Sequence, residues 1–157
     1  MNEIRGAFDA RGRRFAMVAA SFNDVVVSKL VEGATAAFRS HGISDEDLIL
    51  AWVPGAFELP LVARRLASSG LYDAVLCLGA VVRGETPHFD FVAGQAARGI
   101  AAVAVETGVP ALFGVLTTET MEQALDRAGG KHGNKGWDAA MAAMQVASVL
   151  DQLPQKE

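Results

Sequence analysis

Short, strongly apolar runs alternate along the chain with longer segments in which apolar and polar side chains are mixed. Each run is rich in Val, Ala and Leu and has the length of a strand. The four runs cover residues 15–21, 47–53, 73–82 and 111–117. Because their apolar character is nearly continuous, we expect strands of a sheet that is covered on both faces.

The segments between the runs place apolar side chains at helical spacing. In the first of them, Val27, Leu30 and Ala34 recur every three or four residues, and Gly42 follows as a helix stop. The helices expected in this way cover residues 24–42, 57–70, 86–107 and 136–153, with a short helix inside residues 120–130.

Strand and helix alternate over a chain of 157 residues that has no repeat or linker. This order predicts a parallel sheet with right-handed crossovers. We therefore expect an α/β fold with one domain over residues 1–157, a three-layer α/β/α sandwich around a four-stranded parallel sheet. Ligands of such folds bind past the carboxyl ends of the strands, which directs attention to the residues that follow each strand.

Charge and composition exclude several classes of protein. The net charge of −4 argues against broad nucleic-acid binding. No apolar run approaches the roughly 18 residues that a membrane span needs. Cys77 is the only cysteine, so no internal disulfide can form, and without a visible signal peptide we expect a cytoplasmic protein. The apolar fraction of 51% is high for a monomer of this size and indicates a partner subunit.

Aromatic and acidic residues follow the first two expected strands. Phe22 either plugs the end of the core or offers a flat ring on which a planar heterocycle could stack. Glu58 either favours its helix through the helix dipole or accepts hydrogen bonds from ligand hydroxyls. The small residues of the intervening Pro-Gly-Ala stretch leave backbone groups open to a polar ligand.

The stretch Gly-Glu-Thr-Pro-His, residues 84–88, follows the third expected strand. Thr86 as N-cap and Pro87 as first helical residue predict a helix start, whose unpaired N–H groups attract phosphate. At this end the helix dipole disfavours a charged imidazole, so His88 is either a neutral base or proton shuttle, or an ordinary surface residue.

The glycine-rich loop of residues 126–136 carries several cationic side chains. It lacks the pattern of a nucleotide-binding phosphate loop, and it is either a flexible connector or a phosphate site to which Arg127 contributes a bidentate contact. Three histidines and one cysteine show no zinc-ligand spacing, so we expect no metal.

Five stretches together resemble the 6,7-dimethyl-8-ribityllumazine synthase family. They are "FN" at 22–23, "VPGAFELP" at 53–60, "LGAVVRGETPHFDFV" at 78–92, "FGVLTTET" at 113–120 and "GNKGWDAA" at 133–140. The resemblance spans nearly the whole chain. It implies flavodoxin-like strand order and the penultimate step of riboflavin biosynthesis, without metal or cofactor. In that step 5-amino-6-(D-ribitylamino)uracil and 3,4-dihydroxy-2-butanone 4-phosphate condense to the lumazine, phosphate and water.

The resemblance also implies a role for each matching residue. The pyrimidine would stack on Phe22, and its ribityl chain would lie against Ala56, Phe57 and Glu58. The ring pocket would be lined by Ala80, Val81 and Val82, and the butanone phosphate would bind at Gly84, Glu85 and Thr86. His88 would transfer protons. The neighbouring subunit would supply Phe113, Arg127 and Lys135.

Assembly follows from the same resemblance. Family members with a loop as short as "GGKHGNKG" tend to form sixty-subunit shells built from pentamers, so we expect a homo-oligomer of that kind. The N-terminal segment, about residues 4–10, would pair as a strand with the neighbour's sheet. The alternative to the enzyme is a non-enzymatic flavin or lumazine carrier, or a shell-forming protein, on the same fold.

Overall fold

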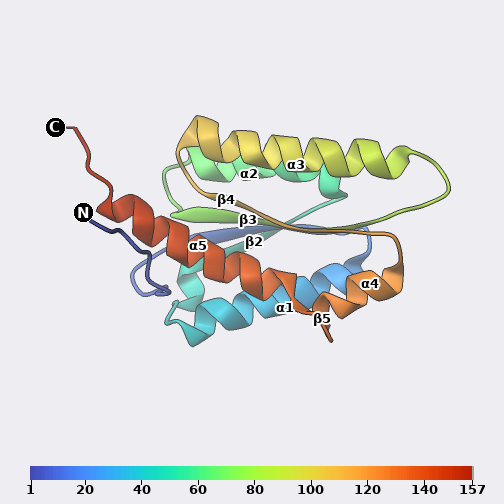
Figure 1. Cartoon of the computed structure of the whole chain (residues 1–157), viewed down its shortest axis with the longest axis horizontal. Helices are drawn as coiled ribbons and strands as arrows, with labels where there is room; N and C mark the ends of the chain where they lie inside the picture. Colours follow the sequence, from blue (N-terminus) through green and yellow to red (C-terminus); the bar gives the residue numbers. More distant parts are fainter. Residues whose placement is uncertain (157) are drawn as a thin grey trace.

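A computed structural model describes residues 1–156 of the chain and contains a four-stranded parallel sheet (Figure 1). The strands are β1 (Phe15–Ala20), β2 (Leu48–Val53), β3 (Ala74–Val82) and β4 (Ala111–Thr118). Their order across the sheet is β2-β1-β3-β4, with every neighbouring pair parallel. The four expected strands and the flavodoxin-like order are therefore confirmed.

Helices cover both faces of this sheet. The long helices are α1 (Asp24–Ser40), α2 (Leu59–Ser68), α3 (His88–Thr107) and α5 (Lys135–Gln152), and α4 (Met121–Asp126) is short. Figure 1 shows α2 and α3 above the sheet, with α1, α4 and α5 below it. The three-layer α/β/α arrangement is confirmed.

The position of β1 inside the sheet explains why its sequence is apolar throughout. All six of its residues are buried. Phe15 and Met17 belong to the core on the α1 and α5 side, where the ring of Phe15 stacks on that of Phe38 with centroids 4.4 Å apart. Ala16 and Val18 belong to the core on the α2 and α3 side. Since successive side chains point to opposite faces, a strand between two helical layers needs apolar residues at every position.

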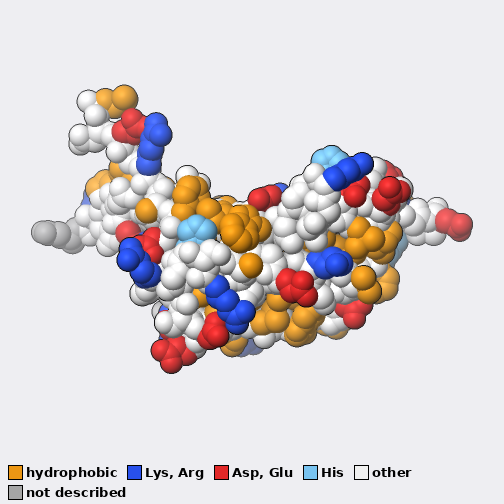
Figure 2. Space-filling view, turned by 90° about the horizontal axis from the view of Figure 1, so that it is seen from below, with side chains coloured by type: hydrophobic (Ala, Val, Ile, Leu, Met, Phe, Trp, Pro, Cys, Tyr) orange, Lys and Arg blue, Asp and Glu red, His pale blue; other side chains and the backbone are white. Residues whose placement is uncertain are grey.

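The edge strand β2 leaves large apolar side chains uncovered in the single chain. Ile49 and Leu50 are exposed, and Trp52 has an exposed fraction of 46%. Apolar side chains also lie open among charged ones on the face drawn in Figure 2. An open edge with uncovered apolar side chains is a typical surface for pairing with another chain.

The N-terminal segment lies along α5 and forms no strand within the described residues of the single chain. The N–H of Ala7 donates to the Ser148 hydroxyl at 2.9 Å, and the side-chain amide of Gln152 donates to the Arg5 carbonyl at 2.9 Å. Strand pairing of residues 4–10 with a neighbouring subunit stays a prediction.

The glycine-rich loop is not a flexible connector, which was one of its two interpretations. Inside residues 120–130 the helix α4 ends at Asp126, and a small antiparallel pair follows, β5 (Ala128–Gly130) and β6 (Gly133–Asn134). Gly129 and Gly133 have φ values of 105° and 80°, which other residues rarely adopt. A hydrogen bond of 2.9 Å from the Lys135 N–H to the Arg127 carbonyl closes the hairpin. The loop is therefore shaped by its own hydrogen bonds.

Two further boundaries differ from expectation. Residues 56–58 form a single 3₁₀ turn, η2 (Ala56–Glu58), so α2 begins at Leu59 and not at residue 57. The third helix begins at His88, with Pro87 in the N-cap position that we expected for Thr86. Pro87 has ψ of 5°, short of a helical value, and this moves the start by one residue.

None of the helices within residues 1–156 combines the length and apolarity that crossing a membrane requires.

Candidate active site

A cavity with a volume of about 730 Å³ opens past the carboxyl ends of β1, β2 and β3. We call it the main cavity. Predicted site residues line most of it: Phe22, Ala56, Phe57, Glu58, Ala80, Val81, Val82, Gly84, Thr86 and His88. Glu85 lies outside this lining. Pro54 and Gly55, of the stretch expected to leave backbone groups open to a ligand, also line it, and residues for which no role was predicted complete it: Phe89, Phe91 and Val92. Three parallel strands that end together bring these distant segments to one place.

Phe22 faces the main cavity and does not plug the core. Its exposed fraction is 73%, which rules out the core interpretation. Its N–H donates to the Pro54 carbonyl at 2.9 Å, and Asn23 beside it adopts φ of 61°. The Asn23 side chain donates to the Ala80 carbonyl at 2.9 Å. Asn23 thereby ties the end of β1 to the end of β3 and holds the ring of Phe22 at the mouth of the cavity.

Glu58 closes the η2 turn beside the main cavity and is half-buried. Within residues 1–156 no side chain pairs with its carboxylate, which stays open to donors on a ligand. A carboxylate in this state accepts hydroxyl hydrogen bonds well.

The turn of residues 84–87 leads directly into the first turn of α3. Gly84, Thr86 and His88 are all exposed. The His88 N–H lies 3.5 Å from the Thr86 hydroxyl, at the limit of a hydrogen bond. This twenty-residue helix therefore begins beside the main cavity with weak capping, an arrangement that suits an anion.

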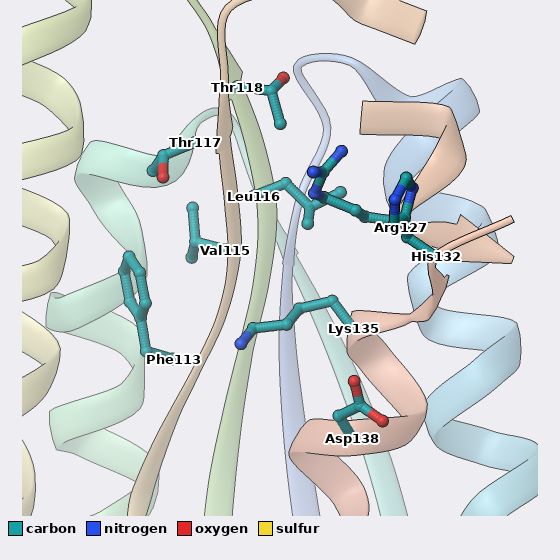
Figure 3. A pocket seen from close by; sticks show the side chains of 9 residues that line it. All are labelled: Phe113, Val115, Leu116, Thr117, Thr118, Arg127, His132, Lys135 and Asp138. Carbon is teal, nitrogen blue, oxygen red and sulfur yellow. The ribbon is translucent and has the colours of Figure 1, made fainter. Parts of the chain in front are cut away.

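A second cavity, the β4 cavity, lies along the edge strand β4 and has a volume of about 370 Å³ (Figure 3). Lys135 extends toward β4 from the start of α5, and Arg127 reaches the same space from the end of α4. The Arg127 guanidinium donates to the Gln123 carbonyl at 3.0 Å, which fixes its direction. The full lining is Phe113, Val115, Leu116, Thr117, Thr118, Arg127, His132, Lys135 and Asp138.

The two cavities divide the predicted site between them. No side chain lines both, and among the described residues the main cavity is lined by no Lys or Arg. Phe113, Arg127 and Lys135, which we expected to come from a neighbour, gather in the β4 cavity. His132, another side chain of the glycine-rich loop, joins them, as does Asp138, which no sequence pattern had marked. Within residues 1–156 no group of three or more His, Cys, Asp or Glu side chains is placed to hold a metal.

Taken together, the fold and the site define a class of protein. The parallel sheet is open, and an exposed aromatic ring, a histidine and a helix start lie past its strand ends. Cations line a second cavity. These features are typical of an α/β enzyme for small anionic substrates.

Comparison with known proteins identifies the family. The family model described as 6,7-dimethyl-8-ribityllumazine synthase matches residues 12–151. A protein of Desulfatibacillum aliphaticivorans, 6,7-dimethyl-8-ribityllumazine synthase, is 51% identical over 149 residues, which cover 95% of this chain and 96% of that protein. The chain belongs to the 6,7-dimethyl-8-ribityllumazine synthase family. It is accordingly an enzyme, a transferase of riboflavin biosynthesis, and not a non-enzymatic carrier.

Proposed function

We propose that each catalytic site combines the main cavity of one subunit with the β4 cavity of its neighbour. There 5-amino-6-(D-ribitylamino)uracil condenses with 3,4-dihydroxy-2-butanone 4-phosphate to 6,7-dimethyl-8-ribityllumazine, phosphate and water, the penultimate step of the pathway. The observation that carries the proposal is the division of groups between the cavities. The main cavity offers a ring, a carboxylate and a histidine, and the cations that a phosphate requires line the β4 cavity.

The pyrimidine substrate fits the main cavity. Its ring stacks on the exposed face of Phe22, and the ribityl hydroxyls donate to the unpaired carboxylate of Glu58. Ala80, Val81 and Val82 form the floor at the end of β3, where small apolar side chains leave backbone groups accessible. Ala56 and Phe57 enclose the ribityl chain.

The phosphorylated substrate binds at the helix start. The turn of Gly84, Glu85 and Thr86 presents the first N–H groups of α3 to the phosphate. Arg127 and Lys135 of the neighbouring subunit supply positive charge, and Phe113 of that subunit closes the site over the ring. A dianion held between a helix start and two cations departs easily when its bond breaks.

His88 moves protons during the condensation. The 5-amino group of the pyrimidine attacks the ketone, and water leaves as the Schiff base forms. Loss of the neighbouring C–H proton then expels phosphate and leaves an enol, which takes up a proton to become a second carbonyl. The ribitylamino nitrogen attacks this carbonyl, and a second water leaves as the ring closes. Each step needs a proton transfer between bound reactants that are held side by side. The imidazole lies one residue beyond the phosphate turn and faces the same cavity, and no metal or cofactor takes part.

The exposed edge of β2 supports assembly into pentamers and sixty-subunit shells. The N-terminal segment of a neighbour adds to this edge as a strand and covers Ile49, Leu50 and Trp52. Each chain forms one domain and works in the cytoplasm, in keeping with its single cysteine, which is buried.

Steady-state kinetics of Arg127→Met test the phosphate assignment. Loss of a charge-assisted hydrogen bond of about 1.5–3 kcal/mol raises the KM for the butanone phosphate about tenfold to a hundredfold. The KM for the pyrimidine changes little. The matched control is Lys131→Met, a neighbouring cation that is outside the β4 cavity lining. Equal effects on both substrates, or an equal effect of the control, would sink the assignment.

A further inference from the structure

Arg83 lies between the main cavity and the β4 cavity of its own chain, which belong to two neighbouring sites in the assembly proposed above. It follows β3 directly, and its N–H donates to the Thr118 carbonyl at the end of β4, at 2.9 Å. Its guanidinium makes an ion pair with Glu119 through Nε at 2.8 Å and donates from Nη2 to Asp90 at 3.3 Å. One side chain thus joins the end of β4 to the first turn of α3.

An aromatic ring holds the guanidinium from one face. The central carbon of the Arg83 guanidinium lies 4.4 Å from the centroid of the Phe89 ring, within range of a cation–π contact. Hydrogen bonds to Glu119 and then Asp90 raise the pKa of Arg83 above its ordinary value, so the side chain stays charged. Two carboxylates and a ring therefore hold an exposed cation in one position.

The partners of Arg83 bracket the phosphate turn. Arg83 precedes Gly84, the first residue of the turn, while Phe89 and Asp90 come directly after His88. Arg83 itself does not line the main cavity, although Phe89 does. Its contacts therefore hold the two ends of the turn together without touching the space that a substrate would occupy.

The same contacts continue toward Arg127. The Glu119 N–H donates to the side-chain oxygen of Gln123 at 2.9 Å, and the Gln123 carbonyl accepts from Arg127 at 3.0 Å. Ion pairs and hydrogen bonds, connected through Glu119 and Gln123 themselves, therefore lead from Asp90 through Arg83 to Arg127 of the same chain's β4 cavity.

Charge adds a second effect. Asp90 and Glu119 have side chains that are 60% and 61% exposed, and both flank the turn. With Arg83 between them, their negative charges are partly neutralised. Without it, two unpaired carboxylates would repel an incoming phosphate dianion.

We infer that Arg83 is a positioning residue for the phosphorylated substrate: it fixes the turn of residues 84–86 and screens Asp90 and Glu119. The inference rests on the phosphate site proposed above. Ion pairs this exposed contribute little to global stability, so substitution of Arg83 acts on substrate binding rather than on folding.

Kinetics of Arg83→Met and Arg83→Lys test this role. Because a charged anchor is lost, we expect Arg83→Met to raise the KM for the butanone phosphate about tenfold and that for the pyrimidine less than about twofold. Arg83→Lys, which keeps the charge but not the fork, recovers part of this loss. In Arg83→Met/Glu119→Gln the KM falls back below that of Arg83→Met, because one repelling carboxylate is gone.

The matched control is Arg39→Met, which breaks an exposed ion pair of 3.0 Å with Asp45 at the far end of α1 and leaves both KM values unchanged. An Arg83→Met enzyme with an unchanged KM for the butanone phosphate, or with equal changes for both substrates, overturns the inference. Should Arg83→Met fail to assemble, Arg83→Lys carries the test: a selective rise in the same KM supports the role, and no rise overturns it.

Kinetics of Arg127→Met measured in parallel distinguish a failure of the role of Arg83 from a failure of the proposed phosphate site. If its KM for the butanone phosphate rises and that of Arg83→Met does not, only the role of Arg83 fails. If neither rises, the phosphate site itself is wrongly placed.

Discussion

Substituting Gly33 tests how α1 and α5 meet behind the β4 cavity. An ideal Cβ on Gly33, in the middle of α1, would lie 2.3 Å from Oδ1 of Asn134, far inside contact distance. Asn134 is the N-cap of α5: its Oδ1 accepts from the N–H groups of Gly136 and Trp137 at 2.8 and 3.1 Å. Its Nδ2 donates to the Lys29 carbonyl of α1 at 3.0 Å. Because Gly33 has no side chain, it leaves the space that the Asn134 side chain occupies when it caps α5.

The magnitudes follow from these contacts. Losing the cap in Asn134→Ala costs about 1 kcal/mol, and losing the bond to Lys29 costs up to about 1 kcal/mol more. Alanine in place of glycine in a helix normally gains up to about 1 kcal/mol. In the natural chain Gly33→Ala must displace Asn134, so we expect a net loss of about 1–2 kcal/mol. In the Asn134→Ala background the space is free, and the same change becomes stabilising.

Urea unfolding of the four chains at one protein concentration measures this coupling, because the stability of an oligomer depends on concentration. The four are the natural chain, Gly33→Ala, Asn134→Ala and the double variant. A reversal of sign for Gly33→Ala between the two backgrounds is the expected result. If Gly33→Ala stabilises both backgrounds equally, Asn134 does not occupy the position described.

Two further predictions concern burial and the N-terminal segment. Burial raises the pKa of the Cys77 thiol to about 12 from 9.0. The folded chain therefore keeps its proton where the unfolded chain loses it, and stability falls as pH rises from 9 toward 12. Unfolding curves should show a steeper alkaline loss for the natural chain than for Cys77→Ala, and parallel curves would refute this. A Cβ on Gly6 would lie 2.0 Å from the Gln145 carbonyl of α5, so Gly6→Ala should displace the N-terminal segment and weaken assembly, as measured by light scattering. An unchanged assembly would contradict the proposed pairing of this segment with the β2 edge of a neighbour.

The fold could be predicted because apolar runs and helical spacing depend on local sequence. The main cavity could also be anticipated, since parallel strands end together and carry Phe22, Glu58 and His88 to one edge. The hairpin of residues 128–134 could not, because its strands are two and three residues long and made mostly of glycine.

The contacts of single side chains depend on residues distant in the sequence and leave no local pattern. Asn134 caps α5 and also reaches Lys29, 105 positions away. Arg83 meets Glu119 only because β3 and β4 are neighbours in the sheet. The resemblance to the family included the stretches that contain Arg83 and Asn134, but it assigned neither residue a role.

Mixed oligomers of His88→Ala and Arg127→Ala chains test most directly whether each site is shared between subunits. His88→Ala damages the main cavity and Arg127→Ala the β4 cavity, so each homo-oligomer has impaired sites only. In a random one-to-one assembly about a quarter of the interfaces combine an intact main cavity with an intact β4 cavity. We predict that co-assembled chains recover about a quarter of the natural activity, well above the mean of the two separate variants. Activity equal to that mean would contradict a site built between neighbouring subunits.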